Sequence, residues 1–584
     1  MNTPLKKMYR FAPVLSTVFL IALLLSRLHI GLVRFFDPDE TANANWAYLI
    51  SQGLLPYRDF FYYYTPLFHW LFAPFFLLPE GPYLIIIFRI IAWSIYVALM
   101  YTLYKIVYTI SQDRLTALLS CFIFIVFPMT FDKVIEIRPD ILMTSLFFIG
   151  VYALYTAKKV QSQQFFISGL CIAVSCLVFM KMIFAFPALL YLLLWNFSIK
   201  HASVWIQKQI VPFCFGFFIP FVLFMLYLYS HSILYLALDD IVRGSIITNM
   251  SSGIYFSLLD ALRPWPIVYL SKGGITLPWI VQIGIWIFGF LGIPIVILRN
   301  RRFGLFIVLF VLFAILFLFI FRRPFVQYFI PLSIIVSVSG AYMLVWCFRF
   351  FHHMCMEKLT PLFFIKATIF YIPPITLISL LLTSYFMQYR ERAVPTNGEQ
   401  LEVLRLVHEH IPKNETVVDL AGSYLYRTSG FLYHVASYAT YIDVFDPKAE
   451  TLTQSLERNQ TKYVVLDQKA YIFWTPKPDD IQFIFTHYLP SPWFKIYTPG
   501  VKFVCNRGSC IQYNLHNQPA FDYPSDSFSL HIKGNYIFTT EPKGQIVRFN
   551  GIQMADGEEK EFLPASYRLT LFSPVRSFIL QFSK

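Results

Sequence analysis

The sequence has few charged residues and none of the familiar nucleotide-binding motifs. Charged residues make up 14% of its 584 positions, whereas soluble proteins contain about 25%, so the chain as a whole is not an ordinary soluble protein. It contains no P-loop, no dinucleotide-binding fingerprint and no other glycine-rich phosphate cradle, so no nucleotide site is predicted. Internal repeats and low-complexity tracts are also lacking, so nothing indicates a repeat architecture.

The net charge of +14 is concentrated in one part of the chain. Residues before Gln388 include 27 Lys and Arg but 13 Asp and Glu, whereas the rest of the chain has 20 of each. The first part also contains the successive apolar runs, and basic residues that flank membrane spans set their topology. The positive charge therefore indicates membrane spans and not a nucleic-acid partner.

Cysteine is sparse, and its spacing does not resemble a zinc site. Six of the eight cysteines lie in or beside apolar runs, where we expect them to be inert core residues. Cys505 and Cys510 flank turn-forming residues in the polar tail. They either close a small disulfide loop in an oxidising compartment or remain free thiols.

Long apolar runs dominate the first 387 residues. A helix needs about 20 apolar residues to cross a bilayer. The first run is too long for a signal-peptide core, so we expect it to remain as the first span. The segment 64–79 is short and contains prolines, and it raises the count if it enters the membrane. The sequence thus predicts a polytopic α-helical membrane protein with about 11–13 transmembrane helices, the eleven candidates being 11–33, 83–108, 115–130, 140–157, 164–180, 182–198, 208–230, 277–298, 303–321, 326–348 and 361–386.

The charges of the loops predict the orientation. With the N-terminus in the cytoplasm, the inner loops are strongly basic and have only Asp113 and Glu357 as acids, whereas the outer loops hold the other acids of this part. Basic residues prefer the cytoplasmic side, and an odd number of spans then places the tail outside. In a bacterium this predicts a multi-pass inner-membrane protein with a periplasmic C-terminal domain.

The tail is predicted to contain two modules. Residues 388–499 combine a helix near 397–411 with buried strands near 416–420 and 462–467, which indicates a small α/β unit. Residues 500–584 hold short alternating stretches, which indicate a β-sandwich-like module. Within it, Gly534-Asn535 fits a tight hairpin turn.

An acidic motif, Asp37-Pro38-Asp39-Glu40, follows the first span. Three carboxylates in four residues repel one another at the membrane surface, which makes ionising all three unfavourable. A site that deprotonates a hydroxyl needs such a carboxylate as general base. The alternative is a helix cap, because these acids suit the N-terminus of a helix over 42–50. The motif alone does not separate the two.

A second motif runs from Glu136 to Asp140, at the outer start of the fourth span. Pro139 and Asp140 also begin a helix well. A helix start does not account for Glu136 and Arg138, so a functional site is favoured here.

Basic residues occur at two further outer positions. Lys181 separates two apolar runs at the outer membrane edge, where it either binds a phosphate headgroup or snorkels at a span boundary. Arg322 and Arg323 break the inside-positive trend, so we expect them to pair with a negative charge, either that of a phosphate or that of the acidic loops. Gln327 and Tyr328 follow them and offer hydrogen bonds to a sugar.

Together these motifs bring carboxylates and cations from four outer loops to one membrane depth. A polyprenyl-phosphate sugar requires this arrangement. The lipid tail stays in the bilayer, cations hold the phosphate, and a carboxylate activates the acceptor outside. Acidic loops could also hold a divalent cation, but no ligand set is distinctive.

The first outer loop carries the strongest resemblance. It contains Asp37-Pro38-Asp39-Glu40, Gly53-Leu54-Leu55-Pro56-Tyr57-Arg58-Asp59-Phe60-Phe61 and Thr65-Pro66-Leu67. With the other three motifs, the chain resembles the bacterial dolichyl-phosphate-mannose-protein mannosyltransferase-like family of the GT-C superfamily, which includes the lipid A aminoarabinose transferase. The resemblance covers roughly 1–390 and, more weakly, the α/β unit; the module 500–584 is not part of it.

The resemblance implies a GT-C catalytic domain over 1–387 and an inverting transfer from a polyprenyl-phosphate sugar. It places the catalytic acid on Asp39 or Glu40, near Asp37. On the donor side it implies Lys181 and Asp140, and we add Arg138, Arg322, Arg323, Gln327 and Tyr328. Tyr57, Arg58 and Asp59 are assigned to the acceptor side.

The expected function is an inner-membrane glycosyltransferase of the cell envelope. Its partners would be the lipid-linked sugar, membrane lipid, and lipopolysaccharide, another glycolipid or protein as acceptor. The main alternative is a transporter or flippase of lipid-linked saccharides, but transporters place charges near the midplane in paired halves, whereas these charges lie at one face. A structural or assembly protein is a third reading.

Overall fold

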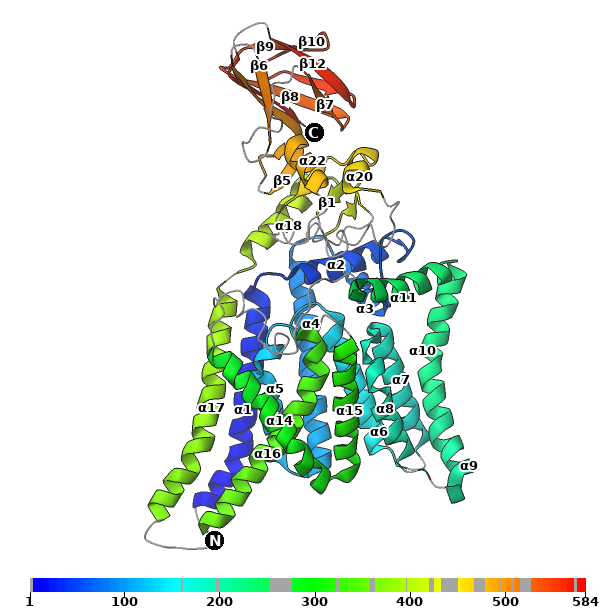
Figure 1. The fold of residues 1–584 in the computed structure, drawn as a ribbon, viewed down its shortest axis with the longest axis vertical. Coiled ribbons are helices and arrows are strands. Elements are labelled where there is room, and N and C mark those ends of the chain that lie inside the picture. Colours follow the sequence, from blue (N-terminus) through cyan, green and yellow to red (C-terminus); the bar gives the residue numbers. More distant parts are fainter. Residues whose placement is uncertain are drawn as a thin grey trace. The chain divides into compact units, whose positions relative to one another are not determined.

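The computed structural model describes most of the chain (Figure 1). Residues outside the described ranges include Arg322, Arg323 and most of the predicted outer loop 231–276. The described ranges are 4–158, 161–195, 197, 199–250, 276–320, 326–356, 363–394, 396–419, 425–431, 450–466, 478–493, 495–506, 509–514, 527–571 and 575–583.

The first part of the chain is helical, and a helix lies at each of the eleven predicted apolar runs. Within the described chain, seven helical segments are long and apolar enough to cross a membrane, and four more are apolar but shorter. The prediction of a polytopic α-helical membrane protein is confirmed. The main helices are α1 (Pro4–Val33), α4 (Tyr83–Ser111), α5 (Arg114–Val126), α6 (Pro139–Thr156), α7 (Ser162–Val178), α8 (Phe186–Leu194), α10 (Val211–Ser230), α14 (Leu277–Arg299), α15 (Arg301–Ile320), α16 (Ile330–Met356) and α17 (Phe363–Ala393).

Shorter helices fill the segments between them. The segment predicted at 64–79 forms two short helices in place of one long span. These shorter elements are α2 (Pro38–Ser51), α3 (Leu67–Phe72), η1 (Ala73–Leu77), η2 (Pro128–Thr130), η3 (Met180–Ala185), η4 (Ile199–His201), α9 (Ala202–Trp205), η5 (Ile206–Ile210), α11 (Leu234–Met250) and η6 (Val326–Phe329).

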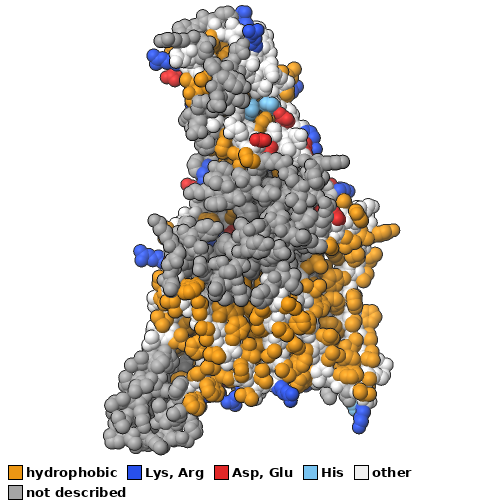
Figure 2. Space-filling view, in the orientation of Figure 1, with side chains coloured by type: hydrophobic (Ala, Val, Ile, Leu, Met, Phe, Trp, Pro, Cys, Tyr) orange, Lys and Arg blue, Asp and Glu red, His pale blue; other side chains and the backbone are white. Residues whose placement is uncertain are grey.

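Glycines let some of these helices approach closely. A Cβ placed on Gly169 of α7 would lie 2.1 Å from the carbonyl oxygen of Phe213 in α10, and one on Gly216 of α10 would lie 2.1 Å from that of Phe166 in α7. Such small-residue contacts are typical of membrane helix packing. Figure 2 shows apolar side chains over the visible surface of the helices, with Lys and Arg at the end where Figure 1 places the N-terminus.

The contacts divide the chain into two compact units. The first contains Met1–Phe35, Tyr63–Leu71 and Ile86–Thr396. The second contains Phe36–Tyr62, Phe72–Ile85 and Asn397–Lys584. Two stretches of the first outer loop, including α2, therefore belong to the same unit as the tail.

The α/β part of the second unit contains a short parallel core. Strand β1 pairs in parallel with both β2 and β3, and β3 pairs antiparallel with β5. The predicted helix and both predicted strands are found, except that Leu420 and Asp467 lie outside the described residues. The elements are α18 (Gly398–His410), β1 (Thr416–Val418), β2 (Thr428–Ser429), α20 (Leu452–Arg458), β3 (Tyr463–Val465), α22 (Pro478–His487), β4 (Tyr488–Pro490) and β5 (Ile496–Asn506).

The C-terminal strands form two sheets. One has the path β11-β8-β13-β5-β3-β1-β2 with β4 and β6 paired to β5, and the other has the order β10-β9-β12-β7. Rings of Phe503, Phe538 and Phe549 surround Phe578, with centroid distances of 4.8–5.9 Å. The strands are β6 (Ser509–Tyr513), β7 (Ser527–Leu530), β8 (Gly534–Glu541), β9 (Ile546–Phe549), β10 (Ile552–Ala555), β11 (Glu559–Phe562), β12 (Ala565–Leu571) and β13 (Ser577–Phe582).

Strand β5 runs through the position where the sequence suggested a boundary between two modules. Its residues Ile496 and Tyr497 pair with β3, and residues 500–504 pair with β13. The α/β part and the β-rich part therefore share one continuous sheet.

The hairpin predicted at Gly534-Asn535 is wrong. Strand β7 pairs with β12, whereas β8 pairs with β11 and β13, so the two strands lie in different sheets. Gly534 is instead the first residue of β8, where a Cβ would lie 2.2 Å from the Phe582 ring. The glycine serves close packing against this ring and does not form a turn.

Cys505 and Cys510 are joined by a disulfide across the paired strands β5 and β6. Peptide mapping of the full chain should find this pair alkylated only after reduction, because disulfides persist in oxidising compartments. The peptide with Cys121, a free thiol, is the control and should react without reductant. Replacing both cysteines of the pair by Ala should lower stability by about 2 kcal/mol, the loop-entropy value for so short a loop. Alkylation of the pair without reductant would contradict the bond.

Candidate active site

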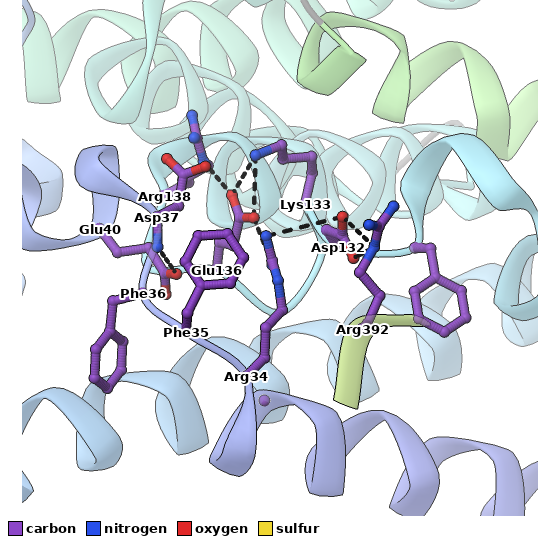
Figure 3. Close-up of polar contacts among 12 residues, drawn as sticks. Arg34, Phe35, Phe36, Asp37, Glu40, Asp132, Lys133, Glu136, Arg138 and Arg392 are labelled. Carbon is purple, nitrogen blue, oxygen red and sulfur yellow. Dashed lines mark hydrogen bonds and ion pairs between the residues drawn. The ribbon is translucent and has the colours of Figure 1, made fainter. Parts of the chain in front are cut away.

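The three acids of the first-loop motif lie at the N-terminus of α2, in the second unit. Asp37 is the N-cap residue, and its side chain accepts a hydrogen bond from the Asp39 backbone N–H at 3.1 Å. In return, the Asp37 N–H donates to Oε1 of Glu40 at 3.0 Å, as Figure 3 shows. This reciprocal arrangement is a capping box, which satisfies N–H groups that the helix leaves without partners.

The capping box uses the carboxylates of two of the three acids. Those of Asp37 and Glu40 accept the cap hydrogen bonds, and Glu40 is completely buried. Asp39 lies in the first turn and is half-buried. The helix cap that the sequence offered as an alternative is therefore present, and it uses two of the three acids.

The stretch after α2 is held by local contacts. The Arg58 guanidinium makes two hydrogen bonds to the Asp59 carboxylate, at 2.8 and 2.9 Å, and Asp59 also accepts from the Leu55 N–H at 2.8 Å. The hydrogen bond from Arg58 lowers the pKa of Asp59 below its usual value. The predicted acceptor-side residues Arg58 and Asp59 thus form a pair with each other.

Aromatic side chains pack around Tyr62 beside this pair. Its ring contacts those of Trp46, Tyr57 and Phe60 at centroid distances of 5.2–5.9 Å. Tyr57, which the sequence assigned to the acceptor side, is buried and has a positive φ of 70°. Such a backbone conformation is strained for a bulky residue, and the ring packing holds it in place.

In the first unit, a buried ionic cluster is centred on Glu136 (Figure 3). Its carboxylate accepts hydrogen bonds from Arg34 at 2.8 Å, Lys133 at 2.9 Å and Arg138 at 2.5 Å. Glu136 is completely buried, and the three cations are less than a tenth exposed. Burial raises the pKa of Glu136, but the charges of Lys133, Arg138 and Arg34 outweigh it and hold the pKa well below its usual value.

Asp132 extends the cluster to the end of α17. Its carboxylate accepts a hydrogen bond from Arg392 Nε at 2.9 Å, and Arg34 Nη2 lies 3.9 Å from it. In these ion pairs four cations, Arg34, Lys133, Arg138 and Arg392, share the two carboxylates of Asp132 and Glu136. The cluster therefore joins the ends of α1 and α17 to the segment before α6.

Helix α6 begins where the sequence predicted, and this start lies next to the cluster. Arg138 is its N-cap residue, Pro139 is its first residue, and the buried Asp140 lies in its first turn. The pairing of Arg138 with Glu136 accounts for the two residues that a simple helix start left unexplained.

The structure brings together two residues that the sequence assigned to the donor. The Lys181 ammonium, in η3, lies 3.3 Å from the ring centroid of Tyr328, in η6. It also lies 4.0 Å from the ring centroid of Phe179, and Phe179 contacts the ring of Tyr64. Cation–π contacts of this kind hold a lysine beside aromatic faces. Gln327 lies next to Tyr328 in η6 and is half-buried.

Sequence reasoning missed several members of the cluster. Arg34, Lys133 and Arg392 were not singled out, although Arg34 follows the first span on the predicted outer side, where a cation breaks the charge trend. Arg89 of α4 was also missed; it donates to the carbonyl oxygens of Gly31, Arg34 and Phe35 at 2.6–2.8 Å and so caps the end of α1. Among the described residues, no group of three or more His, Cys, Asp or Glu could hold a metal ion.

Replacing Glu136 by Gln should destabilise the protein strongly. The change leaves three buried cations without their shared carboxylate, and breaking a buried ion pair costs about 3–5 kcal/mol. Glu402→Gln is the control, because Glu402 pairs with Arg405 on an exposed helix face, where the loss of a pair has little effect. Thermal unfolding in detergent measures both.

Acid should act in the same direction as the Glu136→Gln change. The folded pKa of Glu136 is depressed, so its stabilising contribution is complete above the unfolded pKa of about 4.3 and is lost as the pH falls through the folded pKa. Equal stability of the Glu136→Gln and Glu402→Gln variants at neutral pH would contradict this account.

Two comparisons relate the chain to known proteins. Residues 64–229 match the sequence model of the family described as "Dolichyl-phosphate-mannose-protein mannosyltransferase". No curated protein sequence matches the chain.

The fold is similar to that of solved structures of ArnT from Cupriavidus metallidurans. The structure bound to undecaprenyl phosphate has a TM-score of 0.55 and 11% identity, and the apo structure has a TM-score of 0.50 and 10% identity. Each likeness covers 83% of this chain and 97% of the other. The predicted resemblance is confirmed to this extent: residues 64–229 match the mannosyltransferase family model, and the fold is similar to that of ArnT.

Proposed function

We propose that the protein is an inverting glycosyltransferase that moves a sugar from a polyprenyl-phosphate carrier to an acceptor outside the cytoplasm. The contact between Lys181 and Tyr328 carries the proposal, because it unites donor residues from two distant segments. The fold supports it, since the ArnT of similar fold is described as bound to undecaprenyl phosphate.

The reaction needs a leaving group and a base. The acceptor hydroxyl attacks the anomeric carbon while the bond from that carbon to the phosphate oxygen breaks. The polyprenyl phosphate leaves with the electron pair, and a carboxylate takes the proton of the hydroxyl. Cations near the phosphate stabilise the charge that develops on it.

Asp39 is assigned as the base. The capping box supports this choice over its neighbours, because the carboxylates of Asp37 and Glu40 accept backbone N–H groups. Asp39 is half-buried, whereas Glu40 is enclosed.

The donor phosphate is assigned to Lys181, with Tyr328 and Gln327 beside it. In the ionic cluster centred on Glu136, which includes Arg138, cations outnumber carboxylates in the described ion pairs. This excess of positive charge suits an anionic donor. Arg322, Arg323 and Asp140 keep the donor role that the sequence gave them, and Tyr57, Arg58 and Asp59 keep the acceptor side.

The tail is assigned to the periplasm of a bacterium, with the helical unit in the inner membrane. The loop charges carry this topology, and the disulfide between Cys505 and Cys510 supports an oxidising surrounding for the tail. The proposed acceptor is one of three kinds of molecule: lipopolysaccharide, another glycolipid or a protein.

A transferase and a flippase of lipid-linked saccharides differ in product. Purified protein should move labelled sugar from undecaprenyl-phosphate-linked mannose, glucose or aminoarabinose to acceptors in membranes of a deletion strain. Uptake of the lipid-linked sugar into vesicles without transfer would support the flippase and overturn the proposal.

Asp39→Asn should lower turnover by about 10²–10⁴-fold, the usual contribution of base catalysis, while undecaprenyl phosphate still binds. The amide keeps the shape of the side chain but cannot accept the proton. Glu40→Gln is the comparison: it should weaken the helix cap and retain more turnover than Asp39→Asn. Loss of turnover in Glu40→Gln alone would move the base to Glu40.

Lys181→Met should weaken binding of undecaprenyl phosphate about tenfold to a hundredfold, because a charge-assisted hydrogen bond contributes about 1.5–3 kcal/mol. Lys105→Met is the matched control, since the Lys105 ammonium also lies over an aromatic ring, that of Tyr101, at 5.9 Å. Lys105 lies near the C-terminal end of α4, which is predicted on the inner side. Equal affinities of the two variants would make Lys181 a marker of topology only.

A further inference from the structure

The side chain of Gln400 clamps the backbone just before the first-loop acids. Gln400 lies in the first turn of α18. Its Oε1 accepts a hydrogen bond from the Phe36 N–H at 2.6 Å, and its Nε2 donates to the Phe36 carbonyl oxygen at 3.0 Å. Both residues belong to the second unit. Gln400 thus pairs with Phe36 in the way that a neighbouring β-strand would.

The clamp restricts the chain directly before Asp37. A backbone residue whose N–H and carbonyl are both bonded to one side chain cannot rotate without losing both hydrogen bonds. Asp37 follows at once and is fixed by the capping box, in which its carboxylate accepts from the Asp39 N–H. A continuous series of bonded residues therefore leads from Gln400 through Phe36 and Asp37 to Asp39.

Gln400 is itself held by the core of the α/β part. Val403 and Val407 of the same helix are completely buried against strand residues such as Val417 and Val465. Phe36 is also completely buried, so no water competes for its polar groups. The clamp therefore connects the start of α2 to a packed sheet.

The second stretch of the first outer loop is anchored at the opposite, C-terminal end of α18. Glu80 pairs with Lys413 at 2.8 Å, with His408 at 3.1 Å and with Arg427 at 3.4 Å. Arg427 is almost fully buried and donates to the carbonyl oxygen of Ile411. Burial raises the pKa of Glu80, but the hydrogen bond from Lys413 and the charge of Arg427 outweigh it and lower the pKa.

We propose that Gln400 is a positioning residue of the transferase, which holds the first-loop acids in their working geometry through the backbone of Phe36. The α/β part of the tail then contributes to catalysis by positioning the first-loop acids. The inference rests on the proposed function, because it takes Asp39 as the base. A displacement of about 1 Å at such a group lowers rates about a hundredfold.

Three variants of the full-length protein test the clamp. Gln400→Met has a similar size and removes both hydrogen bonds. Gln400→Glu keeps an acceptor for the Phe36 N–H but removes the donor to the Phe36 carbonyl. Glu399→Met is the control on the adjacent position, where an exposed side chain pairs with Lys495. Transfer of sugar from undecaprenyl-phosphate-linked donors to membrane acceptors gives kcat and the donor KM, and thermal unfolding gives stability.

Gln400→Met should lower the kcat of the folded protein about tenfold to a hundredfold, with the donor KM close to wild type. It should also lower the unfolding midpoint, because the buried N–H and carbonyl of Phe36 lose their partners. The kcat of Gln400→Glu should lie between those of Gln400→Met and wild type. The kcat of Glu399→Met should equal that of wild type. A fall in activity that only follows loss of folded protein would overturn the proposal, because Gln400 would then have a structural role alone.

The two proposals fail in distinguishable ways. If Gln400→Met turns over at the wild-type rate while Asp39→Asn is inactive, the clamp proposal is wrong and the proposed function stands. If neither change affects turnover, Asp39 is not the base and the clamp proposal is wrong, whereas the observed transfer leaves the proposed activity standing. If the wild-type protein transfers no sugar, the proposed function is wrong.

Discussion

The burial of one carboxylate organises the helical unit. Glu136 has no contact with solvent, and it is surrounded by Arg34, Lys133 and Arg138. A charge in such surroundings is tolerated only when it is paired and hydrogen-bonded. The pairing fixes the end of α1 against the start of α6, and Asp132 brings in the end of α17 through Arg392. Arg89 adds the cap of α1, so the positions of four helices depend on one group of charges.

In the second unit, the two stretches of the first outer loop are held by other contacts. The start of α2 is held by its capping box and by Gln400, and the stretch before α4 is held by Glu80. Each device satisfies polar groups that would otherwise be buried without partners. The first outer loop is therefore shaped by residues more than three hundred positions away in the sequence.

The sequence predicted the helices because an apolar run in a bilayer satisfies its backbone only as a helix or in a closed barrel. It could not predict the ionic cluster, because Arg34 and Glu136 are 102 residues apart and Arg392 and Asp132 are 260 apart. The hairpin at Gly534 failed for a related reason: the packing of Phe582, and not the local turn preference, decides how that glycine is used. Lys181 and Tyr328 come from two motifs that were assigned separately to the donor, and the structure places them in contact. Their roles stay predictions.

The cap of α2 also bears on which acid can serve as a base. A base gains a proton in each turnover, and it must do so without losing the structure around it. A proton on Glu40 would weaken the acceptor for the Asp37 N–H, since hydrogen bonds to a charged carboxylate are the stronger ones. A proton on Asp37 would weaken the bond from the Asp39 N–H in the same way. Protonation of Asp39 leaves both of these hydrogen bonds with their carboxylate acceptors, Glu40 and Asp37, unchanged. The proposal of Asp39 as the base thus leaves Asp37 and Glu40 to hold the start of α2 through the capping box.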